Sequence, residues 1–196
     1  MAGLRIFLFL SVATTLAYGK EEILSTKEFK RVVYYPETYS HVSIVEEANT
    51  TYNCYATGPW YLPDLEEVTI SLECEMGCSP VTDVDISSLV LFHSYKRDIG
   101  IRLEKDDRYA LIKSSQDGDA CAIDWNVSVD DDGQGGYLDE FCDTVNSPPS
   151  YLPLTSLSDE FQGIDGCGNW TLVIADVLGG DVGEVLEVGI TYQTTE

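Results

Sequence analysis

Residues 169–192 read NWTLVIADVLGGDVGEVLEVGITY, and this stretch decides the fold class. Two runs rich in β-branched and aromatic residues, 170–175 and 185–192, flank a polar bend that holds two aspartates and three glycines. Such runs predict strands, and the glycines permit the positive φ angles that tight turns need. The stretch therefore predicts a β-hairpin of adjacent strands whose shoulders carry Asp176 and Asp181.

Short runs of the same kind recur along the chain. They lie at 31–35, 41–45, 68–72, 84–92, 99–103, 109–113 and 125–129. Turn-forming residues separate them, and no apolar period of about 3.6 residues persists as an amphipathic helix requires. The pattern predicts an all-β protein with one domain, a jelly-roll-like antiparallel β-sandwich.

The N-terminus has the features of a secretory signal. Residues 1–19 combine one positive charge, a short apolar run and small residues before a cleavage point after Gly19. A membrane-spanning helix needs roughly 20 apolar residues, so we expect a signal peptide and a secreted, extracellular protein without membrane insertion. Residues 20–57 are expected to add strands to the sandwich or to form an arm, and 58–196 to form the sandwich itself.

The charge is strongly negative and unevenly distributed. The sequence has 34 acidic and 11 basic residues, and no Lys or Arg occurs from Ser114 to Glu196. Such a field argues against nucleic acid or anionic lipid as a partner. The repulsion between these carboxylates is relieved where cations screen or ligate them, although most of them are expected to form a solvated acidic surface.

Six cysteines in a secreted chain favour disulfides over free thiols. They are Cys54, Cys74, Cys78, Cys121, Cys142 and Cys167. A Cys121–Cys142 bond would close an acidic loop, whereas the other four leave open a Cys74–Cys78 bond or longer-range pairs. Zinc is the alternative, but the spacing gives no second finger-like pair and the two histidines are distant.

Three N-glycosylation sequons begin at Asn49, Asn126 and Asn169. Asn49 lies in a polar loop and is the strongest candidate. Asn169 immediately precedes a strand, where we expect a glycan to be crowded.

Several sequence blocks follow one another in the order of a known module. The block 81–103 reads VTDVDISSLVLFHSYKRDIGIRL, and its matching positions are Val84, His93, Tyr95, Asp98, Ile101 and Leu103. Pro63-Asp64 matches ahead of that block. After it come the V-S-V-D-D-D run at 127–132, Leu157, Phe161, Gly163, Gly168, Trp170-Thr171-Leu172, Asp176, Gly180, Asp181, Gly183 and, one residue late, Leu186. Together they resemble the P domain, or P/Homo B domain, of proprotein convertases and bacterial subtilisin-like proteases, from about Pro63 to Tyr192. The sequence departs from the family at 104–108, at Arg97 and at Cys167.

The resemblance is to an accessory domain, so it implies no catalysis. The catalytic domain of a subtilisin-like protease is absent, and no serine motif accompanies His93, which we expect to be structural. Peptidase activity would belong to that missing neighbour.

The resemblance also implies Ca²⁺. The acidic stretch 117–143 does not fit an EF-hand loop, but carboxylates on turns are the hard oxygen ligands that calcium takes. The expected ligands are Asp131 and Asp132, with Asp98, Asp64, Asp176 and Asp181 as weaker candidates. For Asp176 and Asp181, capping of turn amides is an equally good interpretation.

Three functions follow from this sequence. The first is a secreted, non-catalytic P-domain-like module that binds calcium and a protein partner, such as a subtilisin-like protease in trans. The second is a carbohydrate-binding module with a glycan ligand on a platform of Trp60 and Tyr61. The third is an acidic matrix protein that binds calcium diffusely.

Overall fold

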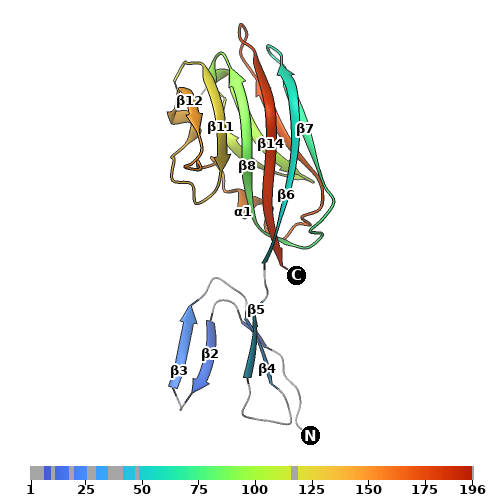
Figure 1. The fold of residues 1–196 in the computed structure, drawn as a ribbon, viewed down its shortest axis with the longest axis vertical. Coiled ribbons are helices and arrows are strands. Elements are labelled where there is room, and N and C mark those ends of the chain that lie inside the picture. The colour runs from blue at the N-terminus through green and yellow to red at the C-terminus, as the bar shows by residue number, and fades with distance from the viewer. Residues whose placement is uncertain are drawn as a thin grey trace. The chain divides into compact units, whose positions relative to one another are not determined.

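The computed structural model describes residues 7–9, 12–17, 20–25, 30–34, 42–46, 49–115 and 119–195 (Figure 1). The chain divides into two compact units, of which the first ends at Asn49. That unit contains β1 (Phe7–Phe9), β2 (Val12–Ala17), β3 (Lys20–Ser25), β4 (Lys30–Tyr34) and β5 (Val42–Glu46). One sheet has the order β1-β4-β5, and β2 pairs with β3. The predicted cleavage point after Gly19 lies outside the described residues, so the signal peptide stays a prediction.

The second unit, Thr50–Thr195, is a sandwich of two sheets. One sheet has the order β10-β9-β13-β7 and the other the order β12-β11-β8-β14-β6. The strands are β6 (Asn49–Leu62), β7 (Glu67–Cys74), β8 (Val81–His93), β9 (Ile99–Lys105), β10 (Arg108–Lys113), β11 (Ile123–Val129), β12 (Asp143–Asn146), β13 (Gly168–Asp176) and β14 (Gly183–Thr195). This arrangement confirms the predicted all-β sandwich, and its pairs are antiparallel except for β11 with β12.

Helical structure in the sandwich is limited to short turns. These are η1 (Lys96–Asp98), η2 (Leu138–Glu140) and α1 (Leu157–Phe161). No helix among the described residues has the length and apolar character that a membrane crossing requires.

The stretch 169–192 does not form the predicted hairpin of adjacent strands. β13 lies between β9 and β7 in one sheet, whereas β14 lies between β8 and β6 in the other. The bend between them therefore crosses from sheet to sheet, and both strands occupy interior positions with neighbours on each side. The prediction of two strands was right and the prediction of their pairing was wrong, because strand propensity does not encode which sheet a strand joins.

The core consists of alternating residues from both sheets. Trp170, Leu172 and Ile174 of β13 are buried, as are Ile190 and Tyr192 of β14. The alternation follows the two-residue period of a strand.

An aromatic stack extends this core to β6. Phe161 of α1 packs edge-on against Trp170, Trp170 stacks on Tyr192, and Tyr192 stacks on Tyr52.

The sandwich begins earlier than the expected boundary at residue 58. β6 runs from Asn49 through the Gly58-Pro59 pair, so residues 50–57 add a strand to the sandwich, which is one of the two expectations for 20–57.

All six cysteines form disulfides, as predicted. The pairs are Cys54–Cys74, Cys78–Cys167 and Cys121–Cys142. Cys121–Cys142 is the predicted bond across the acidic loop. The local Cys74–Cys78 alternative does not occur, because β7 lies beside β6 and pairs with β13. Three disulfides suit an oxidising compartment.

Candidate functional site: acidic loops at one end of the sandwich

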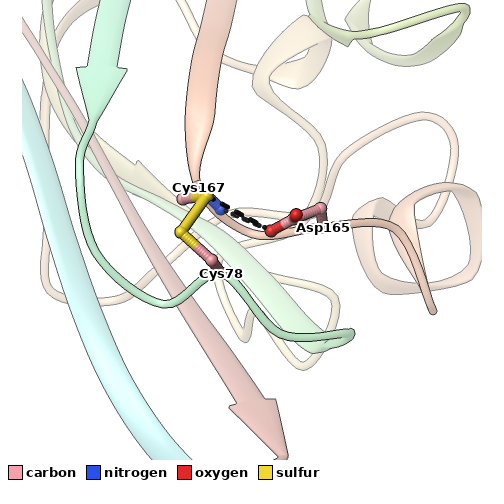
Figure 2. Close-up of side chains that lie close together, drawn as sticks. All are labelled: Cys78, Asp165 and Cys167. Atoms are coloured by element: carbon pink, nitrogen blue, oxygen red, sulfur yellow. Dashed lines mark hydrogen bonds between the residues drawn. A yellow bond between two sulfur atoms is a disulfide. The ribbon is translucent and has the colours of Figure 1, made fainter.

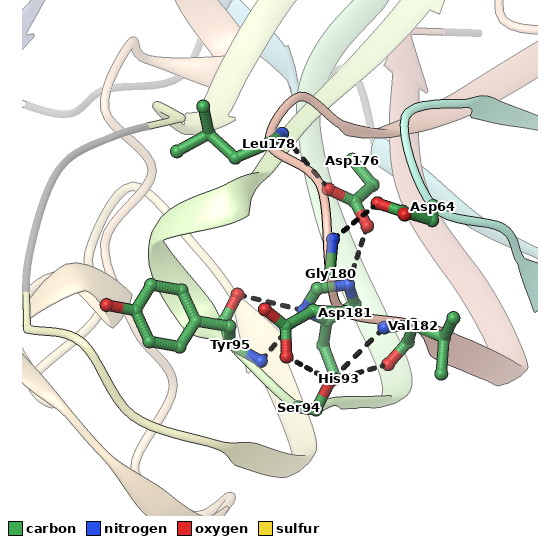
Figure 3. A network of polar contacts seen from close by, with 9 residues as sticks. All are labelled: Asp64, His93, Ser94, Tyr95, Asp176, Leu178, Gly180, Asp181 and Val182. Atoms are coloured by element: carbon green, nitrogen blue, oxygen red, sulfur yellow. Dashed lines mark hydrogen bonds and ion pairs between the residues drawn. The ribbon is translucent and has the colours of Figure 1, made fainter.

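Four aspartates from three loops gather at one end of the sandwich. Figure 3 shows Asp64, Asp176 and Asp181, and Asp98 joins them through a side-chain hydrogen bond with Asp181. Asp64 lies between β6 and β7, Asp98 ends η1 after β8, and Asp176 and Asp181 border the bend between β13 and β14. We call these four carboxylates, together with His93, the loop-end site. The structure thus brings together the four weaker metal-ligand candidates from distant parts of the sequence.

Hydrogen bonds to these carboxylates hold the loops together. Asp64 Oδ1 accepts from the Gly180 amide at 2.9 Å, and Asp181 Oδ1 accepts from Ser94 Oγ at 2.8 Å. Ser94 Oγ also accepts from the Val182 amide at 3.1 Å. The capping of turn amides is therefore present, and it positions the carboxylates rather than consuming all of their oxygens.

His93 is the buried histidine of the loop-end site. Its side chain is fully buried, and Nε2 lies 3.3 Å from Asp176 Oδ2. Nδ1 lies 2.8 Å from the Tyr95 carbonyl oxygen. A Cβ at Gly183 would lie 2.5 Å from His93 Cδ2, so only glycine lets the bend close over the ring. These contacts fit the structural role expected for His93, and no spacing in the sequence indicates that its partner is Asp176.

Asp98 is the most unusual member of the loop-end site. It is only 2% exposed, and its Oδ1 has no hydrogen-bond partner among the described residues. Burial, followed by the negative charges of Asp176 and Asp181, raises the pKa of Asp98 above its usual range. An unsatisfied buried carboxylate oxygen beside two further carboxylates is electrostatically suited to a cation.

Basic side chains do not neutralise these carboxylates. Among the described residues, the basic side chain in contact with them is that of His93, whose Nε2 lies 3.3 Å from Asp176 Oδ2. Lys96 belongs to η1 with Asp98, but its ammonium donates to the carbonyl oxygens of Asp139 and Phe141 instead. The site therefore keeps most of its negative charge.

The oxygens of the loop-end carboxylates are not close enough together to coordinate one metal ion as they stand. Among the described residues, only Cys78, Asp165 and Cys167 place three ligand atoms within 4.8 Å of one another (Figure 2). Both sulfurs of that trio form a disulfide, and Asp165 Oδ1 accepts from the Cys167 amide, so no thiolate remains for a metal. The loop-end oxygens would have to rotate inward around an ion.

A second acidic cluster surrounds the ends of β8 and β11. Asp85 faces Asp83, Asp130, Asp131 and Asp132, and burial and then these charges raise the pKa of Asp85 to about 7. Alternation of Asp83 and Asp85 with Val84 and Ile86 along β8, next to the D-D-D run, is the sequence signal for this cluster.

Asp131 and Asp132, the first-choice ligands, have different environments within this cluster. Asp131 accepts from Ser156 Oγ and from the amides of Leu157 and Ser158, all at 2.9 Å, and so caps the N-terminus of α1. The Asp132 amide donates to Asp130 Oδ1 at 2.7 Å. The helix therefore occupies both oxygens of Asp131, and calcium binding by this pair stays a prediction.

The remaining predicted sites lie on the strands. Trp60 packs partly against the core, whereas Tyr61 is 60% exposed, because neighbouring residues of a strand face opposite sides. The two rings therefore do not form one platform. Asn49, Asn126 and Asn169 are all exposed, so Asn169 is less crowded than expected. Their glycosylation stays a prediction.

Comparisons with known proteins give no family. No family model and no curated protein matches this sequence. Among solved structures, the Aeromonas sobria serine protease resembles the chain with 12% identity, a TM-score of 0.49 and coverage of 75% of this chain. Its complex with a chaperone gives 11% identity, a TM-score of 0.48 and 76% coverage. The chain spans 27% of the length of each of these. The crystal structure of FLHE resembles the chain with 9% identity and a TM-score of 0.40, and the match covers 76% of this chain and 98% of FLHE. Likenesses of this degree assign neither a family nor an activity.

Proposed function

We propose that this protein is a secreted, non-catalytic, P-domain-like module that binds calcium at the loop-end site and binds a protein partner. The observation that carries the calcium proposal is the gathering of four carboxylates from three loops, in which a buried and unpaired Asp98 oxygen lies near Asp176 and Asp181. Calcium takes six to eight oxygen ligands, and carboxylates on turns can supply several of them. Bound calcium would relieve both the repulsion and the desolvation that raise the pKa of Asp98.

The partner and the location follow from other features. The ordered sequence blocks that resemble a P domain point to a subtilisin-like protease in trans as the partner. Three disulfides and the predicted signal peptide support secretion. The protein contributes no catalytic step in this proposal, and the contacts of His93 support a structural role for the residue that most resembles a catalytic base.

Calorimetric titration of calcium into the chelator-treated, disulfide-intact protein tests the metal proposal. We expect one saturable site with a Kd of roughly 10⁻⁴–10⁻³ M, as in other extracellular modules. Asp98→Asn should abolish that site, whereas the matched variant Asp132→Asn should retain it.

Loss of calcium binding in Asp132→Asn alone would indicate that calcium binds at the second acidic cluster instead. Many weak sites that persist in both variants would support diffuse binding by an acidic matrix protein instead.

A further inference from the structure

The outer edge of β6 differs from the rest of this acidic protein. β6 has 14 residues, lies at the end of the five-stranded sheet, and contains no charged residue. Within the described sandwich, β14 is the only strand that pairs with it. A long uncharged edge strand is a template for pairing with another chain unless it is protected.

The other edges of the sandwich carry recognised forms of protection. Beside β10, the Leu111 amide donates to Thr155 Oγ1 at 2.7 Å and the Thr155 amide donates to the Leu111 carbonyl oxygen at 2.9 Å. β7 carries Glu67 and Glu73, and β12 has only four residues. Charge, coverage and short length all discourage strand addition. Pro59 has no amide donor and protects the C-terminal part of β6, so residues 51–57 of β6 are the edge segment that remains suited to it.

A hollow runs beside β6 and has acidic and aromatic walls. Its volume is about 610 Å³, and its lining includes the half-buried Tyr52 together with Glu73, Glu75 and Met76, whereas Tyr192, which also borders it, is buried. No Lys or Arg is among the residues that line it. Carboxylates beside aromatic faces are suited to an ammonium or guanidinium group.

A second hollow shares the two glutamates. It has a volume of about 380 Å³ and continues from Glu73 and Glu75 to Cys167 and Asn169. Lys105, whose ammonium lies beside the lining residue Gly168, is buried and donates to the Cys167 carbonyl oxygen at 2.8 Å, so it is engaged away from the glutamates.

The opposite side of β6 is also suited to basic side chains. Tyr55 is 76% exposed and Tyr61 is 60% exposed, and both lie on the outer face because their positions along the strand differ by an even number. An added strand directs alternate side chains to the outer face and toward β7. Basic residues at either set of positions would meet a tyrosine face or a glutamate.

We propose that the β6 edge binds an extended, Lys- or Arg-containing segment of a partner protein by strand addition. Backbone hydrogen bonds along β6 supply the affinity, and Glu73, Glu75 and the tyrosines select basic side chains. This inference rests on the partner-binding part of the proposed function and does not depend on calcium.

Fluorescence anisotropy with a labelled peptide of about ten alternating threonine and arginine residues tests the proposal. We expect saturable binding that weakens with salt and is absent for the same peptide with glutamate in place of arginine. N-methylation of alternate amides on the edge facing β6 should abolish binding, whereas N-methylation of the opposite edge should not. Absence of binding, or equal binding of the two N-methylated peptides, would overturn strand addition.

Variants separate this surface from the rest of the acidic molecule. Glu73→Gln/Glu75→Gln should weaken binding by about three- to tenfold, as expected for the loss of two exposed ion pairs. Asp107→Asn/Asp124→Asn makes the same change in charge at exposed positions elsewhere and should leave binding unchanged. Equal weakening in both double variants would overturn the assignment of the glutamates. Asp98→Asn should lose calcium but keep the peptide, so failure of one proposal is distinguishable from failure of the other.

Discussion

Asp85 gives the most quantitative test of the electrostatics in this fold. Its pKa is raised from 3.8 to about 7, first by burial and then by the charges of Asp130, Asp83, Asp131 and Asp132. The folded state therefore holds a proton that the unfolded state releases between about pH 4 and pH 7. The free energy of unfolding must fall as the pH rises through that window, and it is highest below the unfolded pKa.

The magnitude follows from the shift and from the exposure of the side chain. A pKa raised from 3.8 to about 7 corresponds to about 4 kcal/mol for a carboxylate that is fully shielded from water. Asp85 is only half-buried, so solvent screening reduces this to about 1–2 kcal/mol. Asp85→Asn removes the charge and keeps the shape. It should therefore raise the thermal midpoint by about 3–6 °C near pH 8 and change it little near pH 4.

Calorimetric unfolding with a chelator present measures both values. Asp124→Asn, at an exposed position of neighbouring β11, is the matched control and should leave the pH profile unchanged. A lower midpoint for Asp85→Asn near pH 8, or the same shift at both pH values, would refute the reasoning.

Two further predictions concern the segments around this cluster. Asp131→Ala should lower the free energy of unfolding by about 2–3 kcal/mol with or without calcium, because three hydrogen bonds at the start of α1 are lost, whereas Asp132→Ala should change it by less than about 0.5 kcal/mol. Urea titration separates the two, and similar losses would contradict the capping role. Cys121→Ser/Cys142→Ser should cost about 3 kcal/mol, since the bond closes a loop with a sequence separation of 21, and a midpoint within error of the wild type would show that other contacts order this loop.

Most strand positions in the sandwich could be predicted from the sequence, but the pairing of the strands could not. The predicted runs from 68 to 192 all became strands, because alternation and β-branched residues report a half-buried pleated surface. No strand run was assigned at β6, although added strands were one expectation for this region, because Gly58-Pro59 and the asparagines resemble a loop. The strand is held by Tyr52 on Tyr192 and by Cys54–Cys74.

The candidate site was partly readable for a related reason. Asp176 and Asp181 stood out as shoulders of one bend, and Asp98 and Asp64 came from the ordered blocks that resemble a P domain. Their meeting at one end of the sandwich depends on three loops that are distant in sequence. The density of acidic residues favoured Asp131 and Asp132 instead, since composition does not show that α1 uses the Asp131 carboxylate as its cap.

The most direct test of the central claim is the thermal midpoint of the disulfide-intact protein as calcium is titrated after chelation, with magnesium as the control. Our account predicts a saturable, calcium-specific rise equivalent to about 1 kcal/mol at millimolar calcium. The rise should vanish in Asp98→Asn, whose midpoint without calcium should be higher than that of the wild type because a buried, repelled charge is gone. An equal rise with magnesium, or a calcium-dependent rise that survives Asp98→Asn, would contradict calcium binding at the loop-end site.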